Sequence, residues 1–196
     1  GAPLLFQNQV VRGDLEFVKA RESDMGRLAG IPFLITSLTT GEAHVAVTDE
    51  NGQFKSADSW NSHSQRTNGN DAALQGDGSV DEELLDADCG IWFGAFGDGQ
   101  MCPASARGAL PFDRYSLQEL PVAANRGLQL VSIPSISVTR DSVAVDLGTL
   151  DDSDEPGTPE PEIFTQARAE NGTAVSAAVT STALTDRVSY GGLQPG

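Results

Sequence analysis

Short stretches in which apolar and polar residues alternate dominate the chain up to about residue 160, and no sustained helical period accompanies them. Strict alternation is typical of strands that bury one face. The pair Asn51-Gly52 adds a strong hairpin signal. The pattern therefore predicts an all-β fold. The predicted strands cover residues 15–19, 31–37, 44–48, 115–119, 127–132, 135–139 and 143–150.

The segment from residue 59 to 108 breaks this pattern, because it is polar and rich in glycine. Such a composition is typical of a loop insertion on a sandwich, and we expect one helical turn within it, around 82–85. An alternative function to a purely structural module is ligand binding, in which four aromatic residues of this segment present a recognition surface for a host glycan or matrix protein. These residues are Trp60, Trp92, Phe93 and Phe96.

A second break lies between Asp151 and Glu162, where six acidic residues and three prolines occur without a basic residue. This composition cannot bury surface and stiffens the backbone, so it predicts an interdomain linker. Beyond it, only 175–180 and 187–190 are strand-like, too little for a closed sandwich. The predicted organisation is a tail at 1–12, a β-sandwich at 13–152, a linker at 153–162 and the truncated start of a second β domain at 163–196.

Charge and hydropathy exclude two classes of function. The chain has 12 basic and 28 acidic residues and a formal net charge of -16, whereas a nucleic-acid binder needs a basic surface. Its apolar runs are far shorter than the ~20 residues of a membrane-spanning helix, so we expect no membrane insertion of this fragment. No residue spacing suggests a metal site or a cofactor.

Lysine is scarce, and its placement is informative, because the chain has only Lys19 and Lys55. Within the first predicted strand, Leu15, Phe17 and Lys19 share one face. Lys19 should therefore point into the core, where an ammonium without a partner is very costly. We expect it to meet a carboxylate or to lose its proton.

Two other strands offer that carboxylate. Glu119 shares a face with Tyr115 in its predicted strand. The last strand ends in two aspartates, and strict alternation turns Asp151 inward, whereas a bulge at Gly148 would turn Asp152 inward instead. The pattern leaves both alternatives open.

An amine and two carboxyls in a dry core can condense. Burial favours the neutral amine, a protonated carboxyl can polarise the acceptor and carry protons, and fixed geometry supplies the effective concentration. The alternatives are a buried salt-bridge cluster or a lysine that reaches the edge of the sheet.

Cys89 and Cys102 are the two cysteines, and they flank the glycine-rich segment CGIWFGAFGDGQMC. We expect a disulfide that closes this loop, which would indicate an oxidising, exported location, the alternative being two free buried thiols. Residues 12–14 spell Arg-Gly-Asp, an integrin-recognition tripeptide that arises readily by chance.

Several ordered motifs resemble the Cna protein B-type family of Gram-positive adhesins and pilins, also called SpaA-type or prealbumin-like. They are GDLEFVK, LAGIPFLITS, VTDENGQF, YSLQELP and the ending GTLDD, all within 13–152. The resemblance implies an Ig-like β-sandwich with an isopeptide bond from Lys19 to Asp152 and Glu119 as the catalytic carboxyl. It further implies an extracellular structural module of a cell-wall-anchored protein, with neighbouring domains as partners and no catalytic turnover.

The C-terminal segment resembles the opening of the VaFE, or Thr-Gln ester-bond, repeats, through PEIFTQARAENG and ALTDRVSYGGLQPG. This resemblance implies that Thr165 is an ester donor and Asp186 a helper. The glutamine acceptor would lie beyond Gly196, so no ester bond is expected within residues 163–196.

Overall fold

A computed structural model describes residues 10–57, 66–94 and 108–153 with their side chains, and the backbone alone of 162–169 and 184–191. The chain divides into two compact units, Gly1–Asp154 and Glu155–Gly196. Each unit is described by itself. The described secondary structure is strands and short 3-10 turns, so the predicted all-β class is confirmed.

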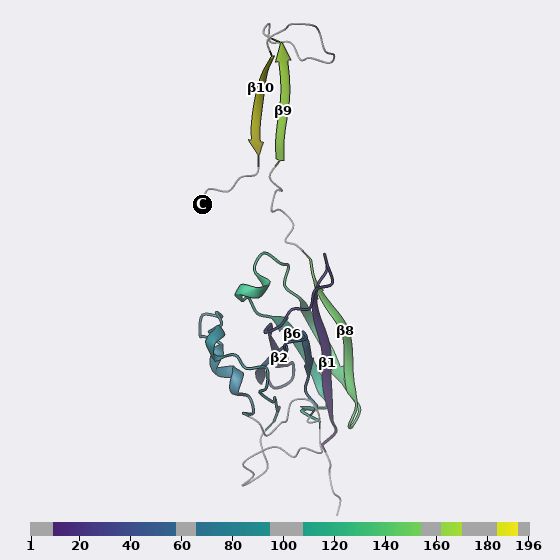
Figure 1. Cartoon of the computed structure of the whole chain (residues 1–196). Helices are drawn as coiled ribbons and strands as arrows, with labels where there is room; N and C mark the ends of the chain where they lie inside the picture. Colours follow the sequence, from purple (N-terminus) through teal and green to yellow (C-terminus); the bar gives the residue numbers. More distant parts are fainter. Residues whose placement is uncertain (1–9, 58–65, 95–107, 154–161, 170–183, 192–196) are drawn as a thin grey trace, which may run out of the picture. The chain divides into compact units, whose positions relative to one another are not determined.

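One sheet of the first unit is built around β1 (Arg12–Arg21). The short strands β4 (Gln53–Lys55) and β5 (Leu110–Pro111) pair with β1 in the antiparallel sense. The last strand of the unit, β8 (Ala144–Asp152), pairs with β1 in the parallel sense, so that the first and last strands are neighbours (Figure 1).

The second sheet is antiparallel throughout, in the order β3-β2-β6-β7. Its strands are β3 (Ala43–Val47), β2 (Pro32–Ser37), β6 (Asp113–Glu119) and β7 (Ser132–Val138). The central strands β2 and β6 direct toward the core the side chains that alternation predicted to be buried. Phe33, Ile35 and Leu117 are among them, and all three are fully buried.

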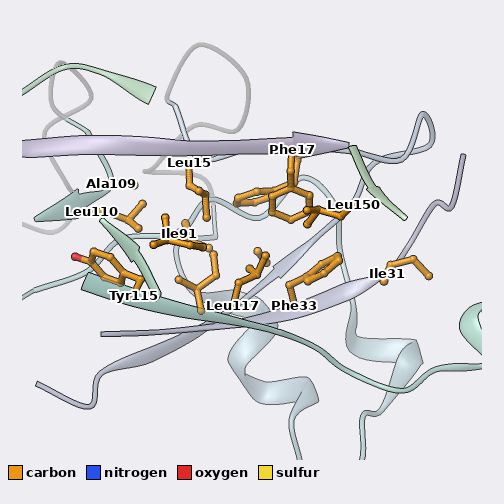
Figure 2. Close-up of a cluster of buried hydrophobic side chains, with 14 of the residues drawn as sticks. Leu15, Phe17, Ile31, Phe33, Ile91, Ala109, Leu110, Tyr115, Leu117 and Leu150 are labelled. Atoms are coloured by element: carbon orange, nitrogen blue, oxygen red, sulfur yellow. The ribbon is translucent and has the colours of Figure 1, made fainter. Parts of the chain in front are cut away.

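The core fills the space between the two sheets (Figure 2). Phe17 of β1 meets Phe33 of β2 edge-on, with ring centroids 4.8 Å apart. The other buried members come from both sheets and from segments between the strands, which makes the unit a β-sandwich. They include Leu15, Ile31, Ile91, Leu110, Tyr115 and Leu150.

The described part of the insertion holds two 3-10 turns, η1 (Gly69–Ala73) and η2 (Glu82–Leu84). The second turn confirms the helical turn predicted there. After them the chain re-enters the core, where the Phe93 amide donates to the carbonyl of Ala109 over 3.0 Å. The insertion is therefore anchored in the sandwich at its C-terminal side.

The predicted strand at 127–132 is wrong. A 3-10 turn, η3 (Ala123–Asn125), and an irregular segment follow β6, and β7 begins only at Ser132. Gly127 has φ 78°, a left-handed conformation that interrupts an extended strand. The Val131 amide donates to the Glu119 carboxylate.

The second unit contains the antiparallel pair β9 (Glu162–Ala169) and β10 (Leu184–Gly191). The strand-like stretch 187–190 lies within β10, and the alternation did not predict β9. The predicted stretch 175–180 lies outside the described residues.

Arg12 closes the end of the sandwich where β1 begins. Its guanidinium donates to the carbonyls of Gly108, Phe93 and Ala109 over 2.6–2.7 Å, and it lies 3.7 Å from the ring centroid of Trp92. Only 5% of Arg12 is exposed. The Arg-Gly-Asp tripeptide is therefore part of the fold, and its arginine is not presented to a receptor.

Replacement of Arg12 by methionine should lower the free energy of unfolding by about 3 kcal/mol or more, because three buried carbonyls lose their donor. Urea denaturation followed by tryptophan fluorescence measures the effect. Arg114→Met, at an exposed position, is the matched control and should change stability little. Equal stability of the two variants would contradict the anchoring role of Arg12.

Candidate functional site

Lys19, Glu119 and Asp152 meet between the two sheets. Lys19 comes from β1, Asp152 from the end of the neighbouring β8, and Glu119 from the end of β6 in the opposite sheet. All three are buried, with exposures of 0%, 1% and 0%. The strands thus bring together three charge-bearing side chains that lie far apart in the sequence.

The Lys19 amine contacts both carboxyls. Its Nζ donates to Oδ1 of Asp152 and lies 3.0 Å from Oε2 of Glu119. The other carboxyl oxygen of Asp152, Oδ2, is buried and has no hydrogen-bond partner among the described residues. One nitrogen is therefore placed between two acids, one of which is incompletely paired.

A β-bulge decides which aspartate faces Lys19. Register with β1 shifts between Asp146 and Thr149 of β8, so that β8 has one extra residue there. Gly148, within this bulge, has φ 68°, which favours glycine. Asp151 is consequently exposed and Asp152 is buried. The structure thus contains the bulge at Gly148, and the alternative prediction that Asp151 faces inward is wrong.

Glu119 is held in place by two further groups that the sequence patterns did not identify. Nδ2 of Asn125 donates to Oε1 of Glu119 over 2.8 Å, and the Val131 amide donates to Oε2 over 3.0 Å. Asn125 is 2% exposed and lies in η3. Nothing in the spacing of the chain marks this asparagine, because its turn follows no apolar period.

Electrostatics make Asp152 easier to protonate than an exposed aspartate. Burial raises the pKa of Asp152 to about 6; the contact with Lys19 opposes this rise, and the charge of Glu119 adds to it. A proton on Asp152 would make the cluster of one ammonium, one carboxylate and one carboxylic acid electrically neutral. A neutral cluster avoids the cost of burying a net charge.

The other expected site residues do not gather into a second centre. Cys89 is buried and has no disulfide partner among the described residues, and burial raises the pKa of its thiol. Its expected disulfide partner, Cys102, lies outside the described residues. In the second unit, Thr165 pairs with Val188 and Asp186 with Ala167. Among the described residues, no group of His, Cys, Asp or Glu could hold a metal ion.

The expected ligand surface is wrong for two of its members. Trp92 is 6% exposed and Phe93 is 1% exposed, so neither can contact a ligand. The polar sequence around them suggested exposure, but Phe93 packs edge-on against Tyr115, with ring centroids 5.1 Å apart. Trp60 and Phe96 lie outside the described residues.

A second titratable cluster ties the insertion to β3. Both ring nitrogens of His44 face carboxylates, with Nδ1 2.7 Å from Asp71 and Nε2 3.0 Å from Glu42. Nδ2 of Asn68 lies 3.3 Å from the same Nε2, and the ring packs edge-on against Phe93. Only the protonated imidazole can donate to both acids, because the neutral ring has one N–H.

Comparisons with known proteins add little to this geometry. No family model matches the chain, and no curated protein matches it. Among solved structures, the Bacillus anthracis TIE protein has 14% identity and a TM-score of 0.39 over 92% of this chain and 27% of its own.

Two pilins give similar values. The major pilin subunit BcpA of Bacillus cereus has 12% identity and a TM-score of 0.37 over 72% of this chain and 30% of its own. A minor pilin of Streptococcus agalactiae has 12% identity and a TM-score of 0.37 over 76% of this chain and 47% of its own. The chain thus spans less than half the length of each of these three proteins.

The His44 cluster predicts a pH dependence of stability. Burial lowers the pKa of His44, but Asp71 and Glu42 outweigh it and raise the pKa above 6.5. The stabilisation by protonated His44 is therefore complete below pH 6.5, the pKa of histidine in the unfolded chain. It is lost as the pH rises through the higher pKa of His44 in the folded chain. His44→Gln should remove this dependence.

The measurement is the difference in unfolding free energy between the parent and His44→Gln at about pH 5 and about pH 9. We expect the difference to shrink at the higher pH by on the order of 1 kcal/mol, the scale of one charged hydrogen bond. A difference that stays constant or grows with pH would contradict the charged clamp.

Proposed function

We propose that residues 13–152 form a structural module closed by a self-formed amide bond between Nζ of Lys19 and Cγ of Asp152. The observation that carries the proposal is the buried cluster itself: an amine between two carboxyls, at the junction of the first and last strands. Glu119 is the proposed catalytic carboxyl. The reaction occurs once per molecule, so the chain is not an enzyme with turnover.

The proposed reaction is a balanced condensation. A proton moves from the Lys19 ammonium to the Asp152 carboxylate, which leaves a neutral amine. The nitrogen lone pair then attacks Cγ of Asp152, and a C–N bond forms while the carbonyl π bond opens. The Glu119 carboxylate takes a proton from nitrogen and delivers it to the departing hydroxyl. The carbonyl re-forms as the C–O bond breaks, and one water leaves.

The structure supports this sequence of proton transfers in two ways. Oε2 of Glu119 lies 3.0 Å from the attacking nitrogen, within reach for proton transfer. Asp152, with a pKa raised to about 6, accepts a proton more easily than an exposed aspartate, and a protonated carboxyl is the better acceptor for an amine.

A permanent salt bridge is the rival explanation. A buried ion pair is stable only when its remaining lone pairs are satisfied by hydrogen bonds. With both carboxyls ionised, Oδ2 of Asp152 is buried without a hydrogen-bond donor among the described residues, which leaves such a pair incomplete. Condensation resolves this defect, because it removes both charges and one of the two carboxyl oxygens.

The position of the bond favours a load-bearing role. Chain tension enters β1 at Arg12 and leaves β8 at Asp152, at opposite ends of two parallel neighbouring strands. A link at Lys19 carries this tension directly across to Asp152. The residues between them, a sequence separation of 133, are then excluded from the force path.

We assign this module to an extracellular, cell-wall-anchored adhesin or pilus stalk, with neighbouring domains of the same protein as its partners. The support for this assignment is the motifs that resemble the Cna B-type family and the parallel pairing of the first and last strands of the module. Within the described ranges, no helix has the length and apolar character needed to cross a membrane.

Intact mass tests the bond. The parent chain should be one water lighter than its sequence mass, and Lys19→Ala should have its full sequence mass. Asp151→Ala is the matched control on the exposed neighbour and should still lose water. A full-mass parent, or loss of water in the Lys19 variant, would contradict the bond at this residue.

Replacement of Asp152 by asparagine gives a sharper result. Condensation of Lys19 with an amide releases ammonia and leaves the same linked product, so Asp152→Asn should reach the same final mass as the linked parent. Glu119→Gln should keep its full sequence mass, because it has no acidic proton to transfer. A different final mass for a reacted Asp152→Asn chain would refute the assigned acceptor.

Loss of the link should also lower stability. Closing a loop with a sequence separation of 133 residues is worth about 4–5 kcal/mol in the chain-entropy treatment. We expect the free energy of unfolding of Glu119→Gln, which keeps the shape of the site, to be lower than that of the parent by about this amount. The variant should therefore unfold at a lower denaturant concentration. Asp151→Ala should unfold like the parent, and an equal midpoint for Glu119→Gln would contradict the stabilising role.

A further inference from the structure

Asn125 occupies the centre of a small buried hydrogen-bond network beside Glu119. Its Oδ1 accepts from the Val122 amide over 2.8 Å. Its Nδ2 donates to the Leu120 carbonyl over 3.0 Å and to Oε1 of Glu119 over 2.8 Å. Every hydrogen-bonding atom of this side chain that faces the protein interior therefore has an assigned partner.

The orientation of the Asn125 amide is fixed by these partners. A backbone N–H can only donate, so the atom facing Val122 must be the oxygen. A backbone carbonyl can only accept, so the atom facing Leu120 must be the nitrogen. The N–H directed at Glu119 is thus a donor by necessity, and Oε1 is held as an acceptor.

Each oxygen of Glu119 accepts from one fixed amide. Oε1 accepts from Asn125 over 2.8 Å, and Oε2 accepts from the backbone N–H of Val131 over 3.0 Å. Oε2 also lies 3.0 Å from the Lys19 amine. The two amides together fix the rotation of the carboxyl, so that Oε2 stays next to the reacting nitrogen.

We propose that Asn125 is a positioning residue for bond formation: it orients the Glu119 carboxyl so that Oε2 faces the Lys19 amine. The proposal rests on the proposed function of the Lys19 cluster. Asn125 does not touch the reacting atoms and acts only through Glu119. The expected consequence of its loss is slower condensation, with the assembled fold retained.

The test follows bond formation in the full chain during cell-free synthesis, with acid quenching and intact mass at successive times. Asn125→Asp keeps the oxygen that accepts from Val122 but loses the amide donor to Glu119. Its rate should fall roughly tenfold or more, the effect of one lost hydrogen bond to a carboxyl that is charged or reacting.

The pH profile separates positioning from folding. The new carboxyl of Asn125→Asp can again donate to Glu119 once it is protonated, so the ratio of variant to parent rate should approach one at low pH and fall as pH rises. A defect of folding alone would instead appear as a matching pH-dependent loss of thermal stability of Asn125→Asp in a Lys19→Ala background. Asn125→Ala, which cannot regain a donor, should be slow throughout.

Asn70 supplies the matched control. It is also buried, at 1% exposure, and it bonds the backbone of Asp86 through both ends of its amide, at 2.8 and 2.9 Å. Asn70 lies within the insertion, and its amide bonds Asp86 and not Glu119. Asn70→Asp should therefore leave the rate of bond formation unchanged and give no pH-dependent rate ratio.

Each outcome decides between the two proposals. A parent that loses water while both Asn125 variants match its rate overturns the role of Asn125 and leaves the proposed function intact. A parent that never loses water overturns both. Thermal unfolding of the Asn125 variants in a Lys19→Ala background reports folding without the bond, and loss of cooperative unfolding there would show that Asn125 serves folding alone.

Discussion

Burial of one lysine amine between two carboxyls constrains the whole first unit. The ammonium cannot stay in the core without compensation, and the two acids cannot both remain charged without it. Three separate strands must therefore bring these side chains to the same place in the core, each on the inward face of its strand. The parallel pairing of β1 with β8, the bulge at Gly148 and the turn that carries Asn125 all serve this requirement.

The rest of the sandwich supplies a dry and rigid surrounding for the cluster. Aromatic and aliphatic side chains of both sheets pack beside it, so water cannot compete for the amine or the acids. The insertion contributes to this core through Ile91 and Phe93, and is tied down by Arg12 at one end and His44 at the other. Its described part is thus a structural addition to the sandwich.

Much of the site could be predicted from the sequence, because the alternation of apolar and polar residues shows which face of a strand is buried. The period of two placed Lys19 and Glu119 on the buried side of their strands, and both are buried. The same rule failed at Asp152, where one extra residue at Gly148 changes the phase. The bulge alternative, which a glycine suggests but does not require, led to the buried acid, as did the resemblance to the ending of Cna B-type domains.

Other features could not be predicted, because they depend on contacts between distant segments. Asn125 lies in a turn without periodicity, and its importance comes from Glu119 in the preceding strand. Trp92 and Phe93 lie in a polar segment that suggested exposure, yet their segment returns to the core. The stretch after Gly127 has a strand-like composition, but the Val131 amide is bonded to a side chain.

The most direct test of the account is peptide mapping of the purified chain by tandem mass spectrometry after protease digestion. The account predicts a branched peptide in which the side chain of Lys19 is joined to that of Asp152, with one water missing. Recovery of separate, unmodified peptides containing Lys19 and Asp152, or a branch at Asp151, would contradict it.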